Sequence, residues 1–104
     1  MQVKNIIIHQ VYFWLNNKAD LPKLIEGLNV LVPITSIRGI HIGIPAATEV
    51  RDVTENTYDA SLSVTFNSIA DHDHYQLDPL HDIFRDDYAA PLCKKIMVLD
   101  SADA

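Results

Sequence analysis

The sequence has one cysteine, Cys93, and three glycines among 104 residues. A single cysteine excludes an internal disulfide and any zinc site built from several cysteines. The glycines form no phosphate-binding loop, and neither a nucleophile elbow nor a dinucleotide-binding fingerprint is present. The sequence therefore gives no motif for a nucleotide, a redox cofactor or a serine nucleophile, and we expect no cofactor.

Positive charge is also scarce, with eight basic against fourteen acidic side chains and a formal net charge of -6. No cluster of lysine and arginine forms a stripe, so we expect neither a nucleic-acid partner nor an anionic membrane surface as partner. Hydrophobic residues make up 48% and charged residues 21% of the chain. These fractions are typical of a soluble globular protein, and the length predicts a single domain over residues 1–104.

Long apolar runs are missing as well, since no segment approaches the roughly 18 apolar residues of a membrane-spanning helix. The amino-terminal segment MQVKNIIIHQVYFWL is interrupted by His9 and Gln10 and has no small-residue cleavage site. We interpret it as a first strand and not as a signal peptide. A cytoplasmic protein is the resulting expectation.

The patterns that are present alternate between strand and helix periodicity. They predict strands over 3–15, 37–44, 58–66 and 93–100, a helix over 20–32, and a second helix that starts at Ser68 and is broken at Pro79. The order strand, helix, two strands, helix, strand predicts an α+β, ferredoxin-like βαββαβ fold with an antiparallel sheet. We expect the first and third strands to lie parallel at its centre, with both helices on one face.

One layer of helices leaves the other face of this sheet without cover. That face is expected to carry Ile8, Tyr12 and Trp14 of the first strand. Because exposed apolar patches mark interaction sites, and two-fold pairing is the commonest symmetry, we predict a homodimer formed sheet to sheet through this face.

Several segments of the chain, in this order and spacing, resemble the stress-responsive A/B barrel domain family, called Dabb, of the dimeric α+β barrels. The matching segments are 9–15, 27–28, 34–37, 58–62, 66–68, 75–81 and 96–100. The resemblance implies that the sheet joins a partner's sheet to form a barrel. Activity in the family is mostly undefined, but some members are polyketide cyclases. Their catalytic tyrosine and histidine stand where Tyr75 and His81 stand here, and the histidine matching His9 lies at the same cavity.

The resemblance is incomplete at one position. The family commonly has His-Pro-x-His, whereas this chain has Asp78-Pro79-Leu80-His81. The replacement changes the charge next to the candidate site and weighs against cyclase-like chemistry.

His81, Tyr75 and His9 are the candidate catalytic residues. An imidazole can take a proton from an activated carbon while a phenol stabilises the developing oxyanion, so His81 is the expected base and Tyr75 the expected oxyanion donor. His9 would line or orient the site. The alternative is that the three side chains form a structural hydrogen-bond cluster that ties strand to helix.

The run Asp71-His72-Asp73-His74 is the other group of potential ligands. Consecutive residues fan around a helix, so the four side chains cannot all bind one ion. We interpret the run as a solvated polar face and expect no metal site.

Three functions remain open from the sequence. The first is a small dimeric protein of undefined activity that binds a small apolar or aromatic molecule between sheet and helices. The second is a polyketide-cyclase-like lyase that uses His81 and Tyr75. The third is a structural, stress-protective oligomer, which requires that the interior be filled by apolar side chains such as Phe13, Leu62 and Phe84.

Overall fold

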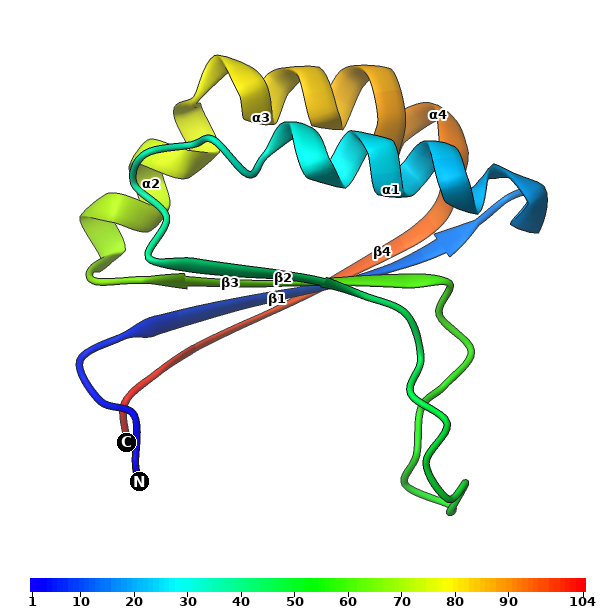
Figure 1. Cartoon of the computed structure of the whole chain (residues 1–104), viewed down its shortest axis with the longest axis horizontal. Coiled ribbons are helices and arrows are strands. Elements are labelled where there is room, and N and C mark those ends of the chain that lie inside the picture. Colours follow the sequence, from blue (N-terminus) through cyan, green and yellow to red (C-terminus); the bar gives the residue numbers. More distant parts are fainter.

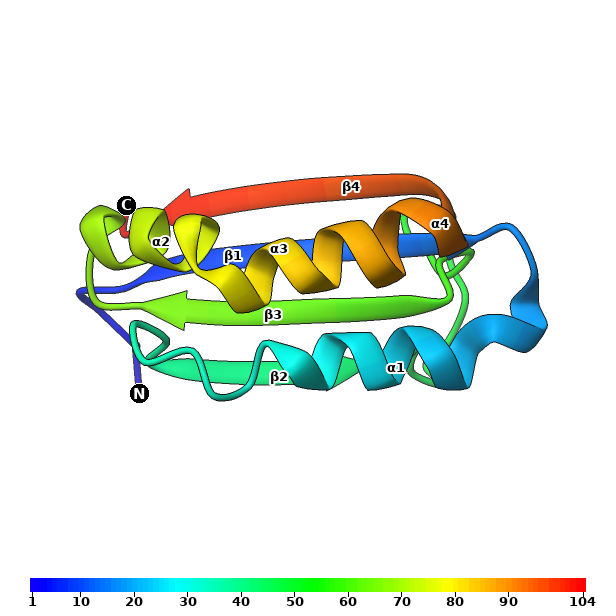
Figure 2. The same cartoon turned by 90° about the horizontal axis from the view of Figure 1, so that it is seen from above.

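A computed structural model describes residues 1–104 as four strands in one sheet with every helix on the same face (Figures 1 and 2). The strands are β1 (Ile7–Leu15), β2 (Gly39–Gly43), β3 (Ala60–Phe66) and β4 (Cys93–Ala102), in the spatial order β2-β3-β1-β4. The helices are α1 (Leu21–Val30), α2 (Ile69–Leu77), α3 (Pro79–Phe84) and α4 (Ala90–Leu92). A 3-10 turn at Lys18–Asp20 precedes α1, and a π-helical segment at Arg85–Ala89 joins α3 to α4. The predicted ferredoxin-like α+β fold is confirmed.

The direction of the central strand pair differs from the prediction. β1 and β3 are neighbours at the centre of the sheet, as expected, but they run antiparallel. The connections between the elements explain this difference. Helix α1 carries the chain back across the sheet, so that β2 runs in the same direction as β1. The chain reverses between β2 and β3, so that β3 runs opposite to both. All three strand pairs are therefore antiparallel.

The register of the strands decides which side chains meet the helices. Val11 of β1 lies between Leu62 of β3 and Val98 of β4, and residues directly opposite each other share a face of the sheet. Val11 and Leu62 are buried, so this is the face that the helices cover. The core is completed by Leu24 and Leu28 of α1, which are fully buried.

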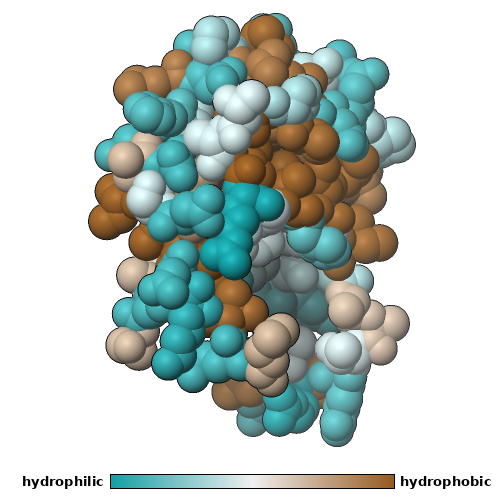
Figure 3. Space-filling model, turned by 60° about the vertical axis from the view of Figure 1, so that its left-hand side comes forward, coloured by the Kyte–Doolittle hydropathy of each residue, from teal (hydrophilic) through white to brown (hydrophobic).

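The helical layer does not extend over the whole sheet. In Figure 2 no helix lies along the length of β4, and Ile96 and Val98, which point to the helix side, remain exposed. Figure 3 shows hydrophobic side chains in a broad patch beside a hollow in the surface. None of the helices combines the length and the apolar character that crossing a membrane requires.

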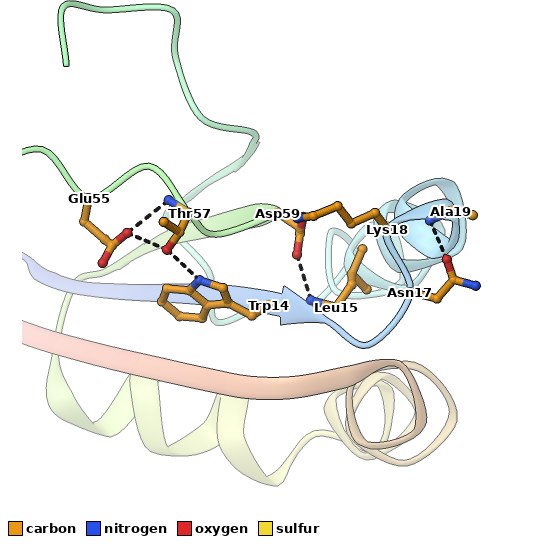
Figure 4. A network of polar contacts seen from close by, with 8 residues as sticks. All are labelled: Trp14, Leu15, Asn17, Lys18, Ala19, Glu55, Thr57 and Asp59. Carbon is orange, nitrogen blue, oxygen red and sulfur yellow. Dashed lines mark hydrogen bonds and ion pairs between the residues drawn. The ribbon is translucent and has the colours of Figure 1, made fainter.

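Helix α2 starts at the residue predicted from the sequence, whereas α1 is preceded by a 3-10 turn that was not predicted. Ser68 is the N-cap of α2, and its hydroxyl accepts a hydrogen bond from the Asp71 amide at 3.1 Å. Asp20, at the start of the predicted helix over 20–32, makes no side-chain hydrogen bond of this kind. Instead the Asn17 side chain accepts from the Ala19 amide at 3.0 Å and starts the 3-10 turn that leads into α1 (Figure 4).

Trp14 is covered by its own chain. Its indole Nε1–H donates to Thr57 Oγ1 at 3.0 Å, and the Thr57 hydroxyl and amide donate in turn to the Glu55 carboxylate (Figure 4). The Lys95 ammonium lies 4.5 Å from the centre of the indole ring, and only 8% of Trp14 is exposed. Trp14 is therefore covered without a second copy of the chain.

Tyr58 also departs from its predicted place. The strand predicted over 58–66 includes Tyr58, but β3 begins only at Ala60. Asp59 accepts hydrogen bonds from the Leu15 amide and the Lys18 ammonium, both at 2.8 Å, and the chain bends there. Because of this bend, Tyr58 packs edge to face on Tyr12, with ring centres 5.0 Å apart, on the open face of the sheet.

Candidate functional site

A partly open cavity of about 190 Å³ lies between the sheet and the helices. Eight of its twelve lining residues are hydrophobic, with Val11, Phe13 and Leu62 contributed by the central strands. The lining includes the three residues predicted from the sequence, namely His9 of β1, Tyr75 of α2, which is one of the eight hydrophobic residues, and His81 of α3. Gln76 and Arg85 also line the cavity, and neither was predicted to do so.

The break between α2 and α3 brings Tyr75 and His81 together. The Asp78 side chain accepts a hydrogen bond from the Leu80 amide at 2.8 Å and is the N-cap of α3, while Pro79 occupies its first turn. A cap followed by proline starts a new helix efficiently. The rings of Tyr75 and His81 then lie 4.9 Å apart between centres. Asp78 thus stabilises the turn that places both side chains.

The three candidate rings form a row with Tyr75 in the middle. The His9 and Tyr75 ring centres are 5.8 Å apart, and the rings of each neighbouring pair meet edge to face. No hydrogen bond joins any two of the three side chains, because the one side-chain hydrogen bond among them runs from His9 to Asp100. The alternative of a structural hydrogen-bond cluster made by these three residues is therefore wrong.

Burial sets the protonation of the two residues at the helix break. Burial lowers the pKa of His81, the nearby Arg85 charge lowers it further, and the Asp82 carboxylate opposes both effects. The imidazole is thus neutral near pH 7, and its buried Nδ1 has no hydrogen-bond partner. Burial also raises the pKa of Tyr75 above its ordinary value, so its hydroxyl stays protonated. The pair offers a neutral base and a phenol donor at one cavity.

His9 has a partner that the sequence analysis missed. Its Nδ1 lies 2.5 Å from Oδ1 of Asp100, which stands directly opposite on β4. His9 is 4% exposed, and the Asp100 side chain is 49% exposed. The alternation of Ile96 and Val98, continued by two residues, places Asp100 on the same face, and this signal was available in the sequence.

His72 was predicted to lie on a solvated face, and this is wrong. Only 20% of its side chain is exposed, and its ring packs on His9 and Phe66 with centres 5.3 and 5.5 Å apart. His72 and Tyr75 are three residues apart and so share the inner face of α2. Asp73 and His74 are exposed, as expected.

A single antiparallel sheet with all helices on one face, and a mainly apolar cavity between the two layers, defines a ferredoxin-like α+β domain. The family model described as stress responsive A/B barrel domain, Dabb, matches residues 7–103. The chain belongs to the Dabb family, and the resemblance drawn from the sequence is confirmed.

Solved structures similar to this chain share its fold. A Dabb family protein with a ferredoxin-like fold from Mesorhizobium loti is 20% identical, with a TM-score of 0.75 and coverage of 95% of this chain and 97% of that one. A dimeric ferredoxin-like protein of unknown function from Jannaschia is 18% identical, with a TM-score of 0.78 and coverage of 94% and 99%. A hydroxynitrile lyase from Passiflora edulis is 21% identical, with a TM-score of 0.77 and coverage of 98% and 96%. No curated protein sequence matches the chain.

Proposed function

We propose that the cavity binds a small, mainly apolar carbonyl compound. The observation that carries the proposal is a mostly hydrophobic cavity lined by Tyr75 and His81, whose side chains make no hydrogen bond within the protein. Such unpaired polar groups beside apolar walls are typical of sites that orient a ligand by a few hydrogen bonds. A volume of about 190 Å³ restricts the ligand to one smaller than a drug-sized molecule.

The packing of the interior supports this proposal over a purely structural protein. Phe13, Leu62 and Phe84 are buried, as a filled interior requires, yet all three line the remaining cavity. The His81 side chain is not tied to the backbone by a hydrogen bond.

The first test compares two probes of similar shape, acetophenone and ethylbenzene, in a thermal-shift assay. Acetophenone at about a hundred times its dissociation constant should add roughly 2.7 kcal/mol to the free energy of unfolding. Ethylbenzene lacks the oxygen that Tyr75 would contact, so its stabilisation should be smaller. Tyr75→Phe keeps the ring and removes the hydroxyl, and it should abolish the preference for acetophenone.

His74→Ala is the matched control, because His74 is an exposed histidine on the same helix and does not line the cavity. This variant should keep the full preference for acetophenone. Equal stabilisation by the two probes in the unmodified protein would refute a carbonyl-binding site.

We propose as a second candidate an acid–base lyase that acts on such a carbonyl compound or its adduct. The neutral His81 imidazole beside the protonated Tyr75 phenol favours it, and a hydroxynitrile lyase shares the fold. In cleavage of a hydroxynitrile, His81 would accept the hydroxyl proton and Tyr75 would stabilise the oxyanion. The carbon–carbon bond then breaks, the oxygen becomes a carbonyl, and cyanide takes the proton from the imidazole. Ring closure of a polyketide would use the same two groups.

The lyase is tested with mandelonitrile, by following the absorbance of released benzaldehyde. A functional base contributes about 10²–10⁴-fold, so His81→Ala should lower kcat by at least about a hundredfold while its circular dichroism is unchanged. His41→Ala, a histidine exposed on β2 away from the cavity, should keep full activity. If purified protein releases benzaldehyde no faster than buffer, this substrate is excluded and the binding function stands alone.

We propose also that two copies of the chain associate through the open face of the sheet. No helix covers this face, which carries Ile8 and Tyr12 of β1 beside Met97 and Leu99 of β4 (Figure 1). Leu99 is 51% exposed, and Tyr12, Met97 and Leu99 line a surface cleft of about 230 Å³. Apolar surface of this kind favours burial against a partner. The similar protein from Jannaschia is described as dimeric.

A further inference from the structure

Three potential metal ligands from separate elements meet at one end of the sheet. One ring nitrogen each of His9 and His72 and a carboxylate oxygen of Asp100 lie within 4.8 Å of one another. They come from β1, α2 and β4, so 63 residues separate the first two in sequence and a further 28 separate the third. We propose that these three side chains bind one divalent transition-metal ion and that Zn²⁺ fits them best.

The surroundings of His72 indicate a ligand on its inner nitrogen. Its Nδ1 lies 3.0 Å from the Asp73 carboxylate, while its buried Nε2 has no hydrogen-bond partner. Histidines that bind metals usually donate their other ring N–H to a carboxylate, which fixes the tautomer and directs the free lone pair at the ion. Asp73 would act on His72 in this way, because a proton held at Nδ1 leaves Nε2 as an acceptor. A buried nitrogen without a partner is otherwise costly.

The hydrogen bond between His9 and Asp100 is compatible with a shared ion. At 2.5 Å their two atoms are closer than two ligands of one tetrahedral zinc, which lie about 3.3 Å apart when each bond is about 2.0 Å. The Asp100 side chain is half exposed, so it can rotate to increase the distance between its oxygen and the His9 nitrogen. The ion would then take the place of this hydrogen bond, and His9 would bind it through Nδ1 with the imidazole proton on Nε2.

The donor set and its access match zinc better than magnesium or calcium. Two imidazoles and one carboxylate are the ligands of open zinc sites, whereas the two hard cations prefer oxygen. A surface cleft of about 290 Å³, lined by His72, Asp73, Asp100 and Ser101, lies beside the ligands and gives water a path to the fourth position. The cleft is separate from the cavity of the proposed function, although His9 is near both. This inference does not rest on that function.

A bound ion would link α2 to β1 and β4. Without the ion, these two strands contact α2 through only a few side chains.

The test uses the full chain without a histidine tag, freed of metal by chelator and titrated with Zn²⁺ by calorimetry. We expect one equivalent to bind and the melting temperature to rise, with both effects reversed by chelator. Co²⁺ in place of Zn²⁺ should give the visible absorption of a site with nitrogen and oxygen ligands and low coordination number.

Variants separate this site from adventitious binding by surface histidines. His72→Ala and Asp100→Ala each remove one ligand and should weaken Zn²⁺ binding about a hundredfold or more, and Asp73→Asn should weaken it about 10–100-fold through His72. His74→Ala, an exposed histidine two residues along α2, should bind like the unmodified protein. The melting temperature of each metal-free variant shows that it is folded. Absence of binding, unchanged affinity in His72→Ala, or equal loss in His74→Ala would each overturn the proposal.

Discussion

A Phe66→Ala protein is expected to lose about 3–5 kcal/mol of unfolding free energy, a large part of the roughly 5–15 kcal/mol available to a domain. Phe66 ends β3 and is fully buried. Its ring lies 5.2 Å from Tyr75 and 5.5 Å from His72 between centres, so it fills the space between the sheet and α2. Truncation to alanine would leave a cavity that the Tyr75 and His72 side chains can fill only by moving away from their present positions.

Urea denaturation at constant temperature measures this loss, and Phe66→Leu is the matched control because it keeps most of the volume. That variant should cost less than about 1.5 kcal/mol. Phe66 does not line the cavity, so a weaker response to acetophenone in Phe66→Leu would report displaced Tyr75 and not a lost contact. A loss below about 1 kcal/mol in Phe66→Ala would contradict the packing described for α2.

The parts of the fold that depend on local pattern could be predicted from the sequence. The alternation from Ala60 to Phe66 gives β3 with every second residue buried, and Ser68 caps the next helix as its sequence position indicates. These features are set by residues close together in the chain, where side-chain period and capping chemistry act directly.

Features that depend on contacts between distant segments were predicted less well. Nothing local to Trp14 indicates that Thr57 and Lys95 will cover it, since the segment before β3 has no periodicity that would show its return to β1. Likewise, the bend at Asp59 follows from hydrogen bonds to Leu15 and Lys18, which are more than forty residues away. Extending the alternating pattern of β3 backwards through this bend therefore assigns Tyr58 to the wrong face of the sheet.

The same distinction applies to the candidate site. The sequence assigned His9, Tyr75 and His81 to one place, and the structure brings their rings into a single row at the cavity. Asp100 and His72 were missed because each becomes significant only through His9, on a strand more than sixty residues earlier. Helical and strand periods predict the face on which each one lies, but not the partner that it meets there.

The largest effect on assembly is expected from Leu99→Asp, which should convert the proposed dimer into a monomer. Leu99 lies on the open face of β4 and is half exposed in the single chain, so a carboxylate there leaves the subunit itself undisturbed. In a two-fold dimer the change places two unpaired charges in the interface. Burying an unpaired charge costs about 3–5 kcal/mol, which raises the dimer dissociation constant by at least about a hundredfold.

Sedimentation velocity over a range of protein concentrations measures this change. Leu77→Asp is the matched control, since Leu77 is an exposed leucine at the end of α2 on the opposite side of the sheet. That variant should sediment as the unmodified dimer, because its charge stays in water. A dimer that persists in Leu99→Asp but is lost in Leu77→Asp would place the interface on the helical layer. If the unmodified chain is a monomer at micromolar concentration, self-association through the sheet is excluded. Since Trp14 is already covered by its own chain, we expect the proposed dimer to be stabilised by the other apolar side chains of the open face, namely Ile8, Tyr12, Met97 and Leu99.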